Sequence, residues 1–277
     1  MATFTVRYSV FHFRGFAGAG DFMGSLVLAR NILLKLDPYN GIRFIPYPLP
    51  AGMLALPFAL LGDRVAGTLF ISLSTAILAG VMILKTGQTW RLLMLFSLQF
   101  AHALEWAQWS PLITAAWFIP VIAPLMVIVK PQIALPIFVN HWAGWGYLIA
   151  IIVLFVSLII SPRWPINWLN LITGYEFIIP LLLPGGFLLA LSILNISSKH
   201  ARLLLAMAVL PARAPYDLLP LFIIPKTPVQ MITLVVLSWL VPAVVLYLVV
   251  LVYVLLGINI QSIRMKILLL RTKLKKY

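Results

Sequence analysis

Long stretches without a charged side chain constrain the fold of this sequence more than any other feature. The stretches that contain no Asp, Glu, Lys or Arg are residues 65–84, 106–129, 131–162, 177–198 and 227–263. About 20 apolar residues are enough to cross the hydrocarbon core of a bilayer. Because these stretches are apolar on every face, without the alternation of barrel strands, they predict transmembrane helices. We therefore expect an integral membrane protein of the all-α class.

Composition sets the domain organisation and excludes several kinds of site. The chain of 277 residues is 63% hydrophobic and 9% charged, against about 45–50% and about 25% in ordinary globular domains. Because no long polar segment is left for a soluble domain, residues 1–277 are predicted to form one polytopic bundle of about seven to nine helices. The absence of cysteine excludes disulfides and thiolate metal sites. The sequence has no Walker loop, dinucleotide fingerprint or metal-ligand spacing, and we expect neither a metal nor another cofactor.

The formal net charge of +14 is distributed in a way that favours a membrane anchor over a nucleic-acid site. Six of the twenty basic residues lie within residues 264–277, directly after the apolar stretch 227–263. Lys and Arg clustered beside a span remain on the cytoplasmic side and can contact anionic lipid. We expect a cytoplasmic basic tail at 264–277, membrane lipid as a partner, and no nucleic acid.

Residues 20–50, "GDFMGSLVLARNILLKLDPYNGIRFIPYPLP", hold Asp21 and Asp37, two of only six acidic residues. Apolar side chains recur at helical spacing over residues 22–36, which predicts an amphipathic helix at the membrane surface. Asp37 precedes a proline and is expected to shape a turn. Asp21 directly precedes the helix, so it is either an N-cap with a structural role or a carboxylate that faces a site.

Other polar side chains interrupt the apolar stretches further along the chain. Lys130 lies between two charge-free stretches, where an ammonium either snorkels to the surface or meets an anion. His102, Glu105 and Gln108 are spaced by three and are predicted to share one helical face. Glu105 is a candidate for a functional or an interface residue. Asp217 is expected in a loop.

Several short motifs occur in one order over residues 18–135: an acidic residue before the helix, then "DPYN", "YPLP", "AQWSP" and "KPQ". In this order they resemble the GT-C superfamily of membrane glycosyltransferases, specifically the glycosyltransferase 87 family with its related mannosyltransferases. That family has an Asp loop, Asn/Asp-Pro-Tyr, Tyr-Pro-Pro, Gly-Gln and Lys-Pro-Gln. Leu49 stands at the second proline and Ala107 at the glycine. The family places a spanning helix before its Asp loop, so we expect here a short, irregular first helix or an N-terminally truncated chain.

The resemblance implies a polytopic GT-C-like bundle in the plasma membrane, with residues 20–50 as an extracytoplasmic active-site loop. It implies inverting transfer of mannose or a similar hexose from a polyprenyl-phosphate donor to a glycolipid or cell-envelope glycan acceptor. Asp21 would be the general base, and the residues carried over for substrate binding are Tyr39, Tyr47, Gln108, Lys130 and Gln132. A cation must hold the leaving phosphate, and Arg43 and Arg30 are the alternatives to Lys130 in this role.

Two other classes of function remain open. In a small transporter or channel subunit, Glu105 and Lys130 would form a charge relay and Asp21 would cap a helix. The third possibility is a non-catalytic membrane assembly protein. A cavity that faces lipid and contains both Asp21 and Lys130 favours the transferase, whereas a pore through the bundle favours the transporter.

Overall fold

The computed structural model describes residues 19–41, 46–141, 144–174, 177–212 and 215–257. Within these ranges the backbone forms helices and turns but no strand, apart from one β-bridge between Ile178 and Ala212. The all-α class is therefore confirmed for the described part of the chain. The basic tail predicted at 264–277 lies outside it.

The described α-helices are short, with two exceptions, and follow one another along most of the chain. They are α2 Phe22–Leu33, α3 Leu49–Ala55, α4 Asp63–Thr86, α5 Leu98–Glu105, α6 Ser110–Ala115, α7 Ala123–Val129, α8 Pro131–Phe138, α9 Gly144–Ile160, α10 Trp164–Ile172, α11 Lys199–Val209, α12 Pro228–Leu240 and α13 Ala243–Leu256. The 3₁₀ helices are η1 Leu56–Phe58, η2 Thr89–Phe96, η3 Pro120–Ile122, η4 Pro180–Leu182, η5 Gly186–Asn195 and η6 Pro215–Ile223.

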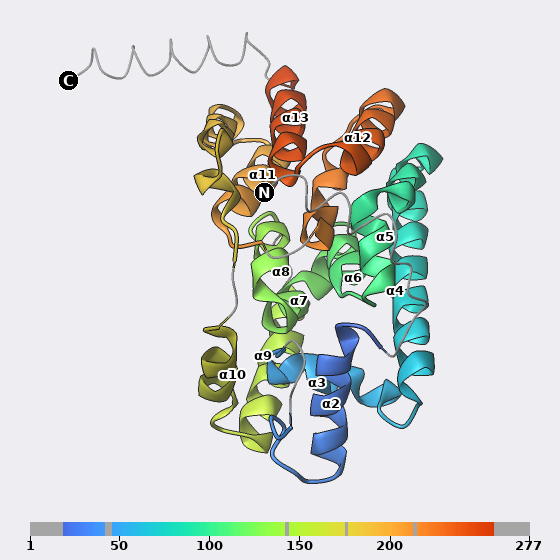
Figure 1. The fold of residues 1–277 in the computed structure, drawn as a ribbon, viewed down its shortest axis with the longest axis vertical. Helices are drawn as coiled ribbons and strands as arrows, with labels where there is room; N and C mark the ends of the chain where they lie inside the picture. The colour runs from blue at the N-terminus through green and yellow to red at the C-terminus, as the bar shows by residue number, and fades with distance from the viewer. Residues whose placement is uncertain (1–18, 42–45, 142–143, 175–176, 213–214, 258–277) are drawn as a thin grey trace, which may run out of the picture.

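The long helix α4 stands along one edge of the molecule (Figure 1). Its 24 residues extend about 36 Å at a rise of about 1.5 Å per residue. Among the described helices it is the one that is long and apolar enough to cross a membrane alone, so the span predicted at 65–84 is confirmed on length and composition. α9 and α10 pass the same test only as a pair, and they meet at a bend of 93°.

Prolines break two of the other predicted spans, and those predictions are wrong. Residues 177–198 form no long helix, because Pro184 and Gly185 (φ +78°) separate η4 from η5. Over 227–263 the sequence predicts one tilted helix, but Pro242 separates α12 from α13. Proline has no N–H to donate, and its ring collides with the preceding helical turn. The described residues therefore form more and shorter helices than the seven to nine predicted.

The helix α2 packs against α3 and is shorter than the helix predicted over residues 22–36. It ends at Leu33, and its buried side chains lie on several faces. They include Phe22, Ser25, Leu26, Leu28, Ala29 and Asn31. The two helices approach closely because Gly52 of α3 has no side chain and lies over Leu28. Figure 1 shows this pair together at the lower end of the molecule.

Arg30 joins the end of α2 to the start of α4 and does not approach the other candidate site residues. Its guanidinium pairs with Asp63 at 2.7 Å and donates to the carbonyls of Ala59 at 3.0 Å and Leu61 at 2.8 Å. These bonds hold the turn that follows η1. Arg30 is thus committed to the fold, which disfavours it as the alternative to Lys130.

An aromatic cluster fixes the position of α2 along the axis of α4. The rings of Phe22 and Phe70 stack with centroids 3.9 Å apart, and Trp109 meets Phe70 at 4.7 Å. Trp109 also donates its indole N–H to the Ser25 hydroxyl at 3.2 Å. Phe70 lies about two turns after Asp63, which is roughly 10 Å along α4. The start of α2 is therefore held about a third of the way along the long helix.

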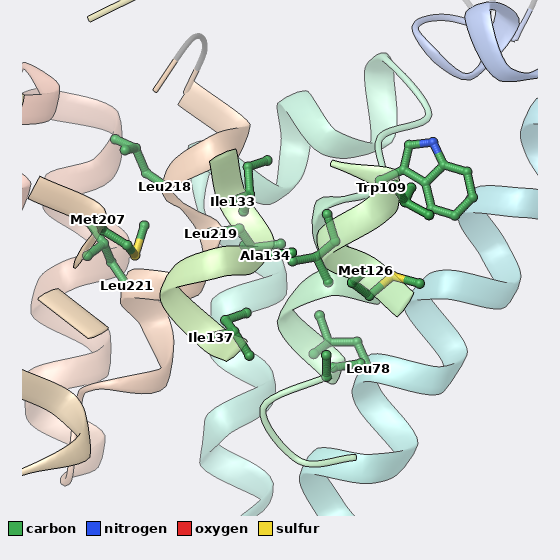
Figure 2. Packing of buried hydrophobic residues seen from close by; sticks show 14 of the residues in the cluster. Leu78, Trp109, Met126, Ile133, Ala134, Ile137, Met207, Leu218, Leu219 and Leu221 are labelled. Carbon is green, nitrogen blue, oxygen red and sulfur yellow. The ribbon is translucent and has the colours of Figure 1, made fainter. Parts of the chain in front are cut away.

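The central helix α8 packs against α6, α7 and α11. In Figure 2 its buried Ile133 and Ile137 lie between Met126 on one side and Met207 and Leu219 on the other. This apolar layer surrounds the junction of α7 and α8, where Lys130 lies.

A matched pair of glycine substitutions tests the α2–α3 contact. In Gly52→Ala the new Cβ would collide with Cβ of Leu28, and overpacking of this kind costs about 1–3 kcal/mol. In Gly80→Ala the new Cβ meets nothing within 4 Å, and alanine favours a helix interior by about 0.5–1 kcal/mol. We expect the midpoint of thermal unfolding to fall for Gly52→Ala and to rise slightly for Gly80→Ala. Equal midpoints would contradict the packing of α2 on α3.

Candidate functional site

The backbone of Asp21 is fixed by a close contact with the end of α5. Gly20 has φ +53°, and a Cβ there would lie 2.5 Å from the carbonyl oxygen of Trp106, so glycine is required. The N–H of Asp21 donates to that carbonyl at 2.8 Å. The side chain makes no helix-capping bond. Instead its Oδ2 accepts from the Gln108 amide and, at 2.7 Å, from the Tyr216 hydroxyl. Asp21 thus occupies the N-cap position of α2, but its side chain faces the site and does not cap the helix.

Gln108 links the acidic and basic sides of this network. It follows Ala107, whose φ of +45° is a left-handed conformation that favours glycine. Gln108 is fully buried, and its Nε2 donates to Asp21. Its Oε1 accepts from the Lys130 ammonium at 3.0 Å and from the Tyr47 hydroxyl at 3.4 Å. Because both ends of the amide are bonded, its orientation is fixed.

The helical face predicted for His102, Glu105 and Gln108 does not form, because α5 ends at Glu105. The imidazole of His102 lies 3.3 Å from the Glu105 carboxylate, and that pair is separate from the network. The ammonium of Lys130 bonds Gln108 and Asp217, and these contacts do not form the relay between Glu105 and Lys130 that the transporter alternative expects.

Lys130 occupies the junction of α7 and α8, where its φ of −147° interrupts the helical backbone. Its side chain is only 7% exposed, and Nζ lies 3.0 Å from Oδ1 of Asp217, whose side chain is 1% exposed. Nζ also lies 4.9 Å from the centre of the Tyr216 ring, within cation–π range. Lys130 therefore meets an anion and does not snorkel. The prediction of a loop position for Asp217 is wrong, because η6 carries it into the core.

Sequence reasoning missed Asp217 and Tyr216 as site residues. The available signal was the carboxylate inside the apolar segment "PYDLLPLF". A buried charge needs an opposite charge, and Lys130 was a cation in a similarly apolar setting. The pairing itself joins positions 87 residues apart, which no local spacing rule connects.

The tyrosines of the site have different roles. Tyr47 lines the pocket described below, whereas Tyr39 donates to the backbone carbonyl of Tyr47 at 3.0 Å and supports that loop from behind. Tyr216 lies in η6, outside the helices long enough to span a bilayer. Burial, and then the charge of Asp21, raise the pKa of the Tyr216 phenol far above its ordinary value. The phenol therefore remains protonated and donates to Asp21.

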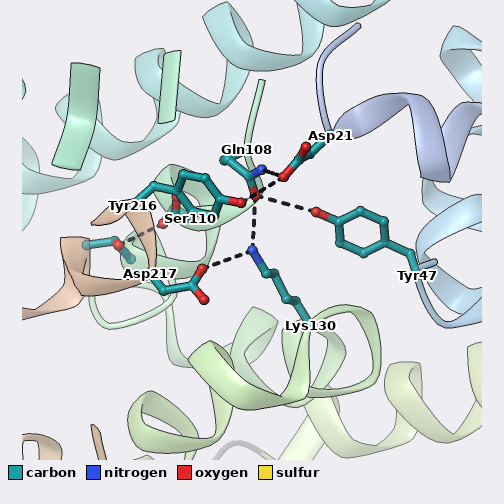
Figure 3. A network of polar contacts seen from close by, with 8 residues as sticks. Asp21, Tyr47, Gln108, Ser110, Lys130, Tyr216 and Asp217 are labelled. Atoms are coloured by element: carbon teal, nitrogen blue, oxygen red, sulfur yellow. Dashed lines mark hydrogen bonds and ion pairs between the residues drawn. The ribbon is translucent and has the colours of Figure 1, made fainter. Parts of the chain in front are cut away.

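A pocket of about 300 Å³ adjoins the network. Its polar end is formed by Asp21, Tyr47, Lys130, Gln132 and Tyr216. Its other walls are apolar and consist of Pro46, Pro48, Val129, Pro131, Leu135, Trp168, Ile172, Phe177, Leu210 and Pro211. Figure 3 shows Asp21 and Lys130 approaching Gln108 from different elements, with Asp217 beyond Lys130.

The structure thus brings together five of the predicted site residues, Asp21, Tyr47, Gln108, Lys130 and Gln132. Tyr39 lies behind them, and Arg43 lies outside the described residues. A pocket with one polar end and long apolar walls suits an amphiphile with a small charged head. Among the described residues, no three His, Cys, Asp or Glu side chains converge as a metal site would require.

Comparisons of the chain with family models, with curated proteins and with solved structures find no match.

Two tyrosine substitutions test the hydrogen bonds of the network against each other. Tyr216→Phe removes a 2.7 Å bond to a carboxylate, and Tyr47→Phe removes a 3.4 Å bond to an amide oxygen. Bonds to charged groups contribute about 1.5–3 kcal/mol, and neutral ones about 0.5–1.5 kcal/mol. We expect Tyr216→Phe to lower the free energy of unfolding more than Tyr47→Phe, measured by denaturation in detergent. A larger loss for Tyr47→Phe would contradict the assigned geometry.

Proposed function

We propose that this chain is a membrane-embedded glycosyltransferase of the GT-C type, resembling the glycosyltransferase 87 family. The donor is a polyprenyl-phosphate-linked sugar, mannose or a similar hexose, and the acceptor is a glycolipid or envelope glycan. The observation that carries the proposal is the pocket in which Asp21 and Lys130 share one polar end while the remaining walls are apolar. This shape fits a phosphate at the polar end and prenyl units along the walls.

The chemistry requires a base and a cation, and the network supplies one of each. Asp21 takes the proton of the acceptor hydroxyl while the oxygen of that hydroxyl attacks the anomeric carbon of the donor sugar. The bond from that carbon to the phosphate oxygen breaks, the phosphate leaves with the electron pair, and the anomeric centre inverts. Lys130 holds the leaving phosphate, since an ammonium fixed in position stabilises the developing charge. Tyr47 and Gln132 are placed to contact the donor.

The outer surface supports a multi-pass membrane location. Large apolar side chains are exposed along the helices far from the pocket, among them Leu73 of α4, Ile151 of α9, Phe187 of η5 and Trp239 of α12. Extended apolar surface of this kind is uncommon on soluble monomers and suits contact with lipid. α4 then crosses the bilayer, and the shorter helices form a bundle beside it.

The resemblance supports an extracytoplasmic position of the site in the plasma membrane. The basic residues next to α4 do not set its orientation, because two lie near each end: Arg30 and Arg64 near its start, and Lys85 and Arg91 near its end. Asp21 is held toward the start of α4 by the stack of Phe22 on Phe70.

A second candidate function, a proton or ion relay in a transporter, is favoured by one observation. Asp21, Gln108, Lys130 and Asp217 form an unbroken series of polar contacts, and such chains of intramembrane charge occur in pumps and transporters. We rank it second because the pocket beside this series is walled mainly by apolar side chains. The third possibility, a non-catalytic assembly protein, has no such observation in its favour.

Asp21→Asn tests the role of the base. Asparagine keeps the shape and accepts hydrogen bonds but cannot take a proton, so sugar transfer should fall by about 10²–10⁴-fold. Transfer from a polyprenyl-phosphate sugar is measured in reconstituted membranes, with Asp37→Asn, an exposed carboxylate outside the pocket, as the control. Unchanged transfer by a folded Asp21→Asn protein would remove Asp21 from this role. If the wild type carries protons but transfers no sugar, and Asp21→Asn loses the proton flux, the relay is favoured.

Lys130→Met tests the role of the cation. The KM for the donor should rise about tenfold or more, because the phosphate loses its ammonium partner, while the KM for the acceptor changes less. Lys130→Arg, which retains the charge, should stay closer to the wild type, and Lys85→Met removes an exposed lysine outside the pocket as a control. An unchanged donor KM in a folded Lys130→Met protein would assign Lys130 to structure alone.

A further inference from the structure

We propose that Asp217 is an internal counter-ion that the donor phosphate displaces from Lys130. This inference rests on the proposed function, in which Lys130 holds that phosphate. In the structure the ammonium lies 3.0 Å from Asp217 and 3.0 Å from the Gln108 amide oxygen. An ammonium has three N–H donors, so two of them are directed at protein oxygens. A phosphate therefore competes with Asp217 for the charge of Lys130.

The charge balance of the site requires this competition. The described charged groups of the network are two carboxylates, Asp21 and Asp217, and one ammonium, Lys130. A phosphate added beside Lys130 gives three anions around one cation, and like charges in a poorly solvated site repel strongly. Asp21 is held by Gln108 and Tyr216 on the other side of the amide. Asp217 is the carboxylate in direct contact with the ammonium, so it is the one that moves.

A second, small cavity next to Asp217 gives the displaced carboxylate a place to go. Its volume is about 10 Å³, and its lining includes Asp217, Gln132 and Tyr247. The Tyr247 hydroxyl already donates to the Met207 carbonyl at 3.2 Å. The donor that this cavity offers to the carboxylate is therefore the Gln132 amide, which also lines the main pocket. A volume of about 10–15 Å³ can hold a water-sized group, which is enough for one carboxylate oxygen. Asp217 lies in a 3₁₀ helix, whose hydrogen bonds are weaker than those of an α-helix.

The exchange also serves product release. The donor phosphate is a diester with one negative charge, whereas the carrier leaves as a monoester that carries about 1.5–2 negative charges at neutral pH. Lys130 alone would therefore hold the product more tightly than the donor. The return of Asp217 to Lys130 weakens that hold and clears the pocket for the next donor.

The experiment is a double-mutant cycle on binding of a polyprenyl monophosphate to the full chain in phosphatidylcholine nanodiscs. Asp217→Asn keeps an oxygen beside Lys130 but removes the charge, so the Kd should fall on the order of tenfold. Lys130→Met should raise the Kd. In the double variant, Asp217→Asn should lower the Kd of Lys130→Met little or not at all. Asp37→Asn, which removes an exposed carboxylate, is the matched control and should leave the Kd unchanged.

The outcomes separate this inference from the proposed function. If the wild type binds the probe and Lys130→Met weakens binding, but a folded Asp217→Asn binds no more tightly, the competition is overturned and the donor site stands. If Asp217→Asn lowers the Kd equally with and without Lys130, the competition is also overturned, since Asp217 would then only repel the phosphate in general. If no variant binds the probe, the proposed donor fails as well. Should Asp217→Asn not fold, Asp217→Ser, which also removes the charge, takes its place. It should likewise lower the Kd, and an unchanged Kd in a folded Asp217→Ser protein would contradict the exchange.

Discussion

The ion pair of Lys130 and Asp217 is the interaction on which the arrangement of the site depends. Both side chains are almost fully buried, and charges removed from water are costly unless they are paired and hydrogen-bonded. Lys130 lies at the junction of α7 and α8, and Asp217 lies in η6. Their contact holds these segments together across 87 positions of sequence, and Gln108 extends it to Asp21. Four segments thus meet around the Gln108 amide: the start of α2, the end of α5, α8 and η6.

Interrupted helices make this convergence possible. Three polar residues of the network stand where the helical backbone changes: Asp21 before α2, Gln108 after α5, and Lys130 between α7 and α8. In an apolar surrounding, irregular backbone is tolerated where it lies inside protein or lines a cavity. The left-handed conformations of Gly20 and Ala107 provide two of these changes of direction. Prolines provide others, which explains why so few of the helices are long.

Much of the fold class, and part of the site, could be predicted from the sequence. The charge-free stretch at 65–84 has no proline and forms α4. Isolated charges in apolar sequence are costly, and this cost indicates Lys130 and Asp21 as candidate site residues. The apolar length of 177–198 and 227–263 predicts single spans, but Pro184 and Pro242 break the helices there. The partner of Lys130 could not be derived, because pairing over a long separation depends on tertiary packing. The ordered motifs of residues 18–135 remain a resemblance.

The proposed function requires that the polar end of the pocket binds the phosphate of a polyprenyl donor. An experimental structure in lipid nanodiscs with a non-hydrolysable donor analogue would locate that phosphate. We expect phosphate density within hydrogen-bond distance of Lys130 Nζ, the sugar facing Asp21, and prenyl density along the apolar wall that contains Trp168. Phosphate bound elsewhere, or a water-filled path through the bundle past Lys130, would contradict it.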